Sequence, residues 1–228
     1  MIRFLHILAG MLFATSLFAM GEDDPLLVSI NVHELEWRED EDLAWDVQGW
    51  IGKDRDKLWF KSEGERPDST TEEFETQVLW HRAVSPYWNL QTGWRGDWQP
   101  ESRRSWFALG VAGTAPGFIE TELTAFIADG RSGARLKAEY EIFVTRRWLL
   151  VPKLETNWYS DTDEVNGRGD GLTDLELDLR LKYQINPQLM PYVGVSFTRL
   201  FGETGDFAED EGERDRSLQV LAGLSFWF

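Results

Sequence analysis

The feature that most constrains the fold is a strict alternation of apolar and polar residues from Leu172 to Ile185. Leucines occupy every second position from Leu175 to Leu181, and charged residues fill the positions between them. A helix would spread these leucines around its circumference, whereas a strand points successive side chains to opposite faces. The run is also longer than the ~5–6 residues of a typical strand in a soluble protein. We therefore predict a long strand with one apolar face.

The same period of two recurs through most of the chain. We predict twelve strands, at residues 26–38, 43–51, 57–65, 72–84, 87–99, 103–115, 118–129, 134–146, 148–160, 171–185, 188–202 and 215–228. Residues 116–117 and 186–187 contain Pro and mark very short connections, while 161–170 and 202–214 are long and acidic. Short turns at one end and long loops at the other are typical of outer-membrane barrels.

A strand with one apolar face needs an apolar partner, either a second sheet or lipid. Three features favour lipid: strand lengths that suffice for a tilted crossing, charges of both signs on the polar faces, and aromatic residues near strand ends. Those aromatic residues, expected as interface girdles, are Trp45, Trp88, Trp98, Trp148, Trp158, Tyr159 and Tyr192. We therefore predict an all-β fold, a transmembrane antiparallel up-and-down β-barrel of about 12 strands.

The first twenty residues predict an exported protein. Arg3 precedes an apolar run, small residues gather near Ala19, and acidic residues follow at once. This order is typical of a cleaved signal peptide. We therefore predict a signal peptide at 1–20, a short periplasmic segment at 21–34 that includes the start of the first strand, and the barrel at 35–228. A retained membrane anchor is the alternative for residues 1–20.

Composition excludes several classes of protein. The mean hydropathy is −0.39, and no apolar run of helical-span length follows the signal, which excludes a polytopic helical membrane protein. The net charge of −17 disfavours nucleic acid as a partner. The chain has no cysteine, which excludes thiolate metal sites and disulfides.

The polar strand faces predict a crowded, charged lumen. The basic residues expected there are Lys61, Arg95, Arg104, Arg135, Lys137, Lys153, Arg180 and Lys182. The acidic residues are Glu63, Glu73, Glu75, Asp97, Glu120, Glu122, Glu139, Glu141, Glu155, Asp174, Glu176 and Asp178. These side chains form either a salt-bridged plug that makes the barrel rigid or a polar path, and the excess of carboxylates then favours cations over anions.

Catalysis finds little support in the sequence. A barrel hydrolase needs a Ser nucleophile, a His base and an orienting group, yet only His33 and His81 remain after the signal. No G-x-S-x-G, H-E-x-x-H or Walker motif is present. We therefore predict that the protein is not an enzyme. Ser105, the Ser nearest a strand start, and His81 are the residues whose substitution would test a lipid hydrolase.

Several segments, taken in order, resemble the copper resistance protein B family. They read WDVQGWIGKD at 45–54, KLWFKSEGE at 57–65, PYWNLQTGWR at 86–95, ALGVAGTAP at 108–116, GDGLTDLEL at 169–177, PYVGV at 191–195 and AGLSFWF at 222–228. The resemblance implies an outer-membrane barrel of a Gram-negative bacterium that handles copper ions beside a periplasmic multicopper oxidase. The terminal Phe228 resembles the signal read by the outer-membrane assembly machinery.

The chain departs from the family in one respect. Family members often carry a Met- and His-rich stretch before the barrel, suited to copper. After the predicted signal peptide, only about 25 residues precede the first family segment here, so we expect copper binding to be weak or transient. The candidate copper ligands are His81 with Glu73 and Glu75 on the same strand, and His33 near the N-terminus. A generic small-solute or cation pore is the main alternative function, and a lipid hydrolase is the last.

Overall fold

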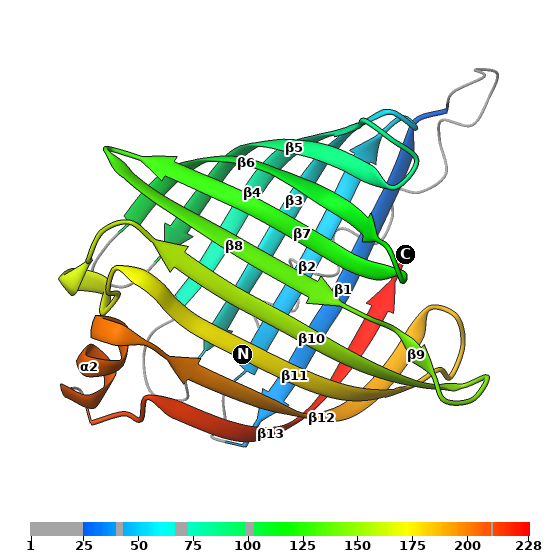
Figure 1. Cartoon of the computed structure of the whole chain (residues 1–228). Helices are drawn as coiled ribbons and strands as arrows, with labels where there is room; N and C mark the ends of the chain where they lie inside the picture. Colours follow the sequence, from blue (N-terminus) through cyan, green and yellow to red (C-terminus); the bar gives the residue numbers. More distant parts are fainter. Residues whose placement is uncertain (1–24, 40–42, 67–72, 99–102, 211) are drawn as a thin grey trace, which may run out of the picture.

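The computed structural model is a closed antiparallel β-barrel (Figure 1). It describes residues 25–39, 43–66, 73–98, 103–210 and 212–228. Each strand pairs with its neighbours in sequence, and β13 pairs with β1 to close the ring. The prediction of a twelve-strand up-and-down barrel is confirmed, with β8 and β9 together forming one of the twelve. The closed ring leaves no free sheet edge exposed to lipid.

The strand bounds follow the alternating segments closely. They are β1 (Leu27–Arg38), β2 (Leu43–Gly52), β3 (Asp56–Arg66), β4 (Glu73–Ala83), β5 (Trp88–Trp98), β6 (Arg103–Ala115), β7 (Ile119–Ala128), β8 (Arg131–Glu139), β9 (Ile142–Phe143), β10 (Trp148–Tyr159), β11 (Gly171–Tyr183), β12 (Leu189–Leu200) and β13 (Arg216–Trp227). Every predicted boundary lies within three residues of the observed one. The predicted signal peptide lies outside the described residues, and residues 27–34 of the predicted N-terminal segment already belong to β1.

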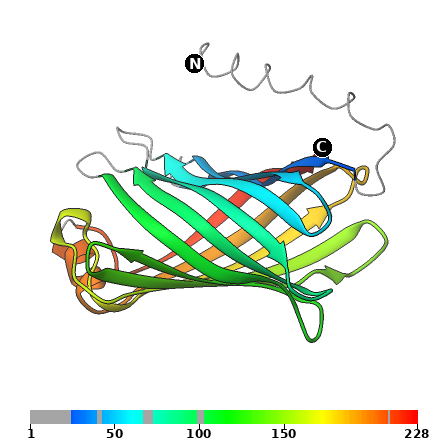
Figure 2. The same cartoon turned by 90° about the horizontal axis from the view of Figure 1, so that it is seen from above.

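The two ends of the barrel differ, and we name them the terminal end and the loop end. At the terminal end, β1 begins and Phe228 finishes the chain, where its backbone N–H donates to Ile30 O at 2.9 Å. The loop end carries residues 160–170, which include the short helix η1 (Glu164–Asn166), and α2 (Gly202–Asp210). Figures 1 and 2 show α2 and the C-terminus at opposite ends. The predicted sorting of short turns and long loops is therefore confirmed, although α2 was expected as loop.

The burial pattern of the barrel wall is reversed relative to a soluble protein. On β11, Leu177 and Leu179 are 41% and 42% exposed, whereas Asp178 and Arg180 between them are buried. The apolar faces therefore point outward and the charged faces inward, as the sequence predicted. Within the described residues, no helix has the length and apolarity needed to cross a membrane.

One predicted strand, 134–146, is interrupted. The ladder between β8 and β10 ends at Glu139, and β9 resumes the same register at Ile142. Tyr140 donates its N–H to Pro152 O at 3.1 Å, but Pro152 has no N–H to give in return. The missing donor explains why the strand breaks there and why β8 and β9 are separate.

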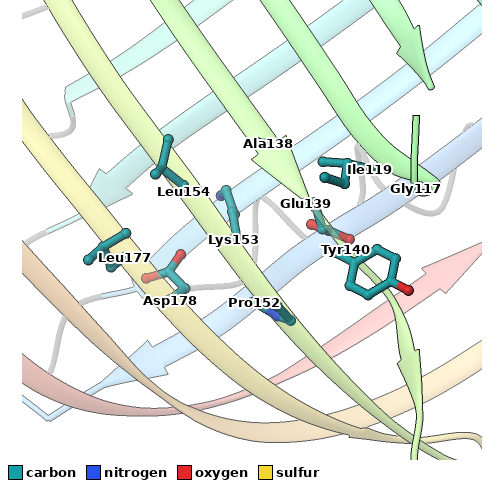
Figure 3. A pocket seen from close by; sticks show the side chains of 10 residues that line it. All are labelled: Gly117, Ile119, Ala138, Glu139, Tyr140, Pro152, Lys153, Leu154, Leu177 and Asp178. Carbon is teal, nitrogen blue, oxygen red and sulfur yellow. The ribbon is translucent and has the colours of Figure 1, made fainter. Parts of the chain in front are cut away.

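A mainly apolar groove of about 580 Å³ lies beside this break (Figure 3). Outward-facing Leu177 and the strand-breaking Pro152 are among its lining residues. Its lining combines neighbouring residues of β8, β10 and β11, so it follows the interrupted ladder. We attribute the groove to the strand break in the lipid-facing wall.

Candidate functional site

One group of buried ion pairs inside the lumen is centred on Arg180. Its guanidinium lies 3.0 Å from Glu34, 3.2 Å from Glu36 and 2.9 Å from Asp178. Arg180 is 1% exposed and Glu36 is fully buried. Glu36 also accepts a hydrogen bond from the Tyr192 hydroxyl at 3.1 Å. Strands β1, β11 and β12 are thus connected through side chains inside the barrel.

A second group of ion pairs crosses the lumen between β3, β4, β8 and β10. Arg135 lies 2.8 Å from Glu75 and 3.5 Å from Glu63. Lys137 joins Glu63 at 2.5 Å to Glu155 at 3.2 Å. We call these pairs and those around Arg180 the ion-paired network. Its members come from facing strands, so ion pairs cross this part of the lumen, as the salt-bridged alternative predicted.

The lumen also contains an apolar plug that sequence reasoning missed. Its buried members are Leu79, Trp106, Ala108, Phe126 and Tyr159. They occupy inward positions on β4, β6, β7 and β10, toward the loop end. Polar-versus-apolar alternation assigns only polar residues to the lumen, so it could not find inward apolar ones.

Two predicted girdle residues prove to be lumen residues. Tyr159 and Tyr192 are each 4% exposed and point into the barrel. Each ring lies against a glycine of a neighbouring strand, where a Cβ on Gly133 or Gly223 would come within 2.7 Å and 2.6 Å of the ring. The girdle prediction was wrong for these two tyrosines because a nearby glycine gives the ring room to lie along the inner wall.

A cavity of about 470 Å³, which we call the vestibule, occupies the terminal end of the lumen. Its lining residues are Asn31, His33, Glu34, Asp46, Gln48, Trp59, Ala112, Gly113, Thr114, Glu120, Thr121, Glu122, Lys137, Ala138, Glu139 and Lys153. They come from the terminal-end halves of β3, β6, β7 and β8 and from the middle of β1, β2 and β10. The vestibule is therefore a hollow inside the barrel that is lined mainly by polar and charged residues.

A β-bulge brings His33 into the vestibule. The register of β1 against β2 shifts between Val32 and Glu34, so His33 is the extra residue. Both His33 and Glu34 line the cavity, although strict alternation would put them on opposite faces. The alternation of residues around His33 does not predict this bulge. It explains how the imidazole reaches the lumen.

Three vestibule carboxylates have no basic partner among the described residues. Glu34 pairs with Lys153 at 2.7 Å, and Glu122 pairs with Lys61 at 2.6 Å. By contrast, Glu120 and Glu139 lie directly opposite each other on β7 and β8, and neither forms an ion pair within 4 Å in the described part of the chain, although Lys153 is the neighbour of Glu139 on β10. Asp46, which is 9% exposed, accepts only from the Gln48 amide, at 3.2 Å. The vestibule therefore carries unneutralised negative charge beside His33.

The other candidate ligands lie elsewhere. His81 is buried and stacks on Trp59 with ring centroids 4.9 Å apart, and it is not among the vestibule residues. Its Nε2 is buried without a hydrogen-bond partner. Glu75 is six residues away on β4, roughly 20 Å at ~3.3 Å per residue, and is held by arginines. The side chain of Glu73 lies outside the described part of the chain.

The structure therefore does not bring His81 and Glu75 together. No group of three or more His, Asp or Glu side chains in the described part of the chain is close enough to form a ready metal site. The hydrolase pair is separated as well, because Ser105 is exposed on the outer face while His81 points inward. Copper ligation by His33, His81, Glu73 or Glu75 stays a prediction.

Comparison with known proteins gives one family and one fold. Residues 26–228 match the family described as "Copper resistance protein B precursor (CopB)". Copper resistance protein B of Escherichia coli is 44% identical over 210 residues, covering 90% of this chain and 71% of the relative. A copper resistance protein B homolog of Pseudomonas syringae pv. tomato (strain ATCC BAA-871 / DC3000) is 43% identical over 199 residues, covering 86% and 68%.

Solved structures give the fold alone. The NanC porin superposes with a TM-score of 0.58 at 9% identity, covering 88% of this chain and 99% of the porin. The KdgM porin superposes with a TM-score of 0.51 at 11% identity, with the same coverage. Both are porins, so the likeness shows a porin-type β-barrel fold.

Proposed function

Because the chain belongs to the copper resistance protein B family, we propose that it is a non-enzymatic outer-membrane barrel of a Gram-negative bacterium that binds copper ions in its vestibule. Family membership supports a role in copper resistance, and the barrel supports an outer-membrane position. The step that we add is the place of copper binding. The vestibule would hold the ion as cargo, weakly and reversibly.

The orientation follows from the two ends of the barrel. Outer-membrane barrels have short periplasmic turns and longer extracellular loops. The terminal end would therefore face the periplasm and the loop end the exterior. In this orientation the vestibule takes copper from the periplasmic side, where the family resemblance places a multicopper oxidase. Phe228, at the same end, is available to the assembly machinery.

The observation that carries the proposal is the unneutralised charge of the vestibule. Glu120, Glu139 and Asp46 lack a basic partner among the described residues, and His33 lines the same cavity. Imidazole nitrogen and carboxylate oxygen are both ligands that Cu(II) accepts. The side chains are spread around the cavity, so the site would suit a partly hydrated ion.

His81 is the second candidate. It offers a buried Nε2 without a hydrogen-bond partner, but it does not line the vestibule, and its ring stacks on Trp59, which does. Lys61, whose ammonium pairs with the nearby Glu122, adds positive charge on that side. Copper would reach His81 only after Trp59 moves, so we place the first contact at His33. Glu75 would have to leave its arginines before it could bind a cation.

Copper tolerance of a strain that lacks this gene tests the proposal. Complementation with the wild-type protein is expected to restore growth in copper. The variant His33→Ala with Glu120→Gln and Glu139→Gln is expected to restore it only partly, because the vestibule then loses its ligands. Glu164→Gln, an exposed acid outside the lumen, is the matched control and should behave as wild type.

Two results would contradict the proposal. Unchanged copper tolerance in the deletion strain, with the partner oxidase present, would remove the role in copper resistance. Full complementation by the triple variant would keep that role and remove the vestibule from it. A steady open conductance in planar bilayers with no response to copper would instead favour a generic pore.

A further inference from the structure

Residues 160–170 fold over the loop end of the lumen, and one buried carboxylate holds them against the wall. Asp163 is 3% exposed although it belongs to a loop. It forms an ion pair with Arg104 of β6 and lies 3.9 Å from Arg131 of β8. We call residues 160–170 the lid and these contacts of Asp163 with the two wall arginines the latch.

The lid has its own internal structure, independent of the wall. The N–H of Asp163 donates to Arg168 O at 2.6 Å, and the N–H of Arg168 donates to Asp163 O at 3.0 Å. Within the lid, the Asp163 carboxylate also accepts from the Asn166 amide at 2.5 Å and lies 3.5 Å from the Arg168 guanidinium. When the lid lifts as a unit, Asp163 keeps these two partners. The latch can therefore break without leaving a buried carboxylate unpaired. An unpaired buried charge would strongly destabilise the open state.

The lid also covers the apolar plug. The Arg168 guanidinium lies 3.8 Å from the ring centroid of Tyr159 and 5.7 Å from that of Trp106. Both rings belong to the plug. A cation over an aromatic face is attracted by the ring quadrupole, so Arg168 fixes the upper surface of the plug. Lifting the lid would remove this cation and expose the plug to water.

The lid buries little apolar surface against the rest of the barrel. Helix η1 has no buried residue, and Val165 is 63% exposed. Two further anchors are polar. Ser160 donates its N–H to Ser132 O of β8 at 2.8 Å, and at α2 Glu203 accepts from Thr162 at 2.5 Å and Thr204 accepts from the Gly169 N–H at 2.9 Å. Charge and hydrogen bonding, rather than a packed apolar core, hold the lid closed.

We propose that residues 160–170 are a gate whose closed state is set by the Asp163 latch, and which controls entry to the lumen from the loop end. The gate does not depend on the copper assignment, because its parts lie at the opposite end from the vestibule. Its behaviour should depend on ionic strength, since salt screens partly exposed ion pairs.

A single cysteine can report on the gate because the chain has none. Thr173, 1% exposed, lies three residues after the lid on β11 and closely matches cysteine in size. In the folded barrel in detergent, Thr173→Cys is expected to react slowly with a membrane-impermeant maleimide. Adding Asp163→Asn should raise the rate on the order of tenfold or more, because the closed state loses its ion pairs. High salt should accelerate the reaction of the intact latch and have little effect on the Asp163→Asn variant.

Arg104→Gln tests the same latch from the wall side and should also accelerate labelling, even if Asp163→Asn perturbs folding of the loop. Arg103→Gln is the matched control, because the neighbouring Arg103 is exposed and lies over Trp98 at 5.3 Å, outside the latch. Heat-modifiable migration on gels verifies that each barrel is folded. Equal labelling rates in the wild-type, Asp163→Asn and Arg104→Gln backgrounds would overturn the gate, as would equal acceleration by Arg103→Gln.

Discussion

Two pairs of glutamates face each other across neighbouring strands, and they differ in what surrounds them. Glu63 and Glu75 lie opposite each other on β3 and β4, and Arg135 reaches both. Glu120 and Glu139 occupy the equivalent arrangement on β7 and β8 with no basic partner among the described residues. The first pair belongs to the ion-paired network and the second to the vestibule.

This difference distinguishes a region where the protein's own side chains neutralise the carboxylates from a region where they do not. Like charges directly opposite each other in a sheet repel unless a cation lies between them. The protein supplies that cation to Glu63 and Glu75 from its own side chains. Glu120 and Glu139 have no such ion pair among the described residues. On our proposal, the vestibule is the part of the lumen where a bound metal cation would reduce this repulsion.

The largest expected effect comes from opening the ion-paired network. Arg180→Ala leaves Glu34, Glu36 and Asp178 without their shared cation and should lower the free energy of unfolding by about 3–5 kcal/mol. Urea unfolding in lipid vesicles, followed by tryptophan fluorescence, measures it. Arg216→Ala is the control, because Arg216 is 75% exposed and its ion pair at 3.8 Å should contribute less than about 1 kcal/mol. Equal effects would mean that the network is not structural.

The next effect tests whether the charged face is the inner one. Leu177→Arg places a charge against lipid and should destabilise the barrel by about 2–4 kcal/mol near the bilayer midplane. Glu176→Gln, one position away, keeps an acceptor for Ser196 and should have a much smaller effect. Folding titrations in vesicles compare the two. Similar losses would show that the assignment of inner and outer faces is wrong.

The smallest effect separates the two glutamate pairs directly. Glu120→Gln with Glu139→Gln removes a repulsion and should raise the free energy of unfolding by about 0.2–1 kcal/mol in metal-free buffer. The same double change at Glu63 and Glu75 should lower it, because Arg135 and Lys137 then lose their carboxylates. Chemical unfolding in the presence of a chelator measures both. A loss of stability in both double variants would remove the contrast between the regions.

The sequence predicted most of the wall. Residues alternate between Leu175 and Leu181 because one side of the strand contacts lipid and the other carries ion pairs. The alternation therefore predicts both the strand and which of its faces points outward. It also placed Arg180, Glu63 and Arg135 inside. Pro152 was visible in the sequence, but the break that it causes depends on which residue lies opposite, which is a matter of register.

The site was harder to predict because it depends on departures from alternation. The bulge that turns His33 inward changes one register step and leaves no pattern in the residues. Tyr159 and Tyr192 point inward because a glycine lies on the neighbouring strand, a contact between residues distant in sequence. The lid depends on Asp163 finding Arg104, 59 positions earlier in the chain. Period-two reasoning contains none of these long-range contacts.

Copper titration of the folded, purified barrel tests the central claim most directly. Wild type is compared with His33→Ala, with the double variant Glu120→Gln and Glu139→Gln, and with His81→Ala, by calorimetry and by the Cu(II) electron paramagnetic resonance spectrum. Binding in the vestibule predicts weaker binding in the first two variants, loss of the nitrogen signature in His33→Ala, and wild-type behaviour in His81→Ala. Undiminished binding in both vestibule variants, or loss confined to His81→Ala, would contradict it.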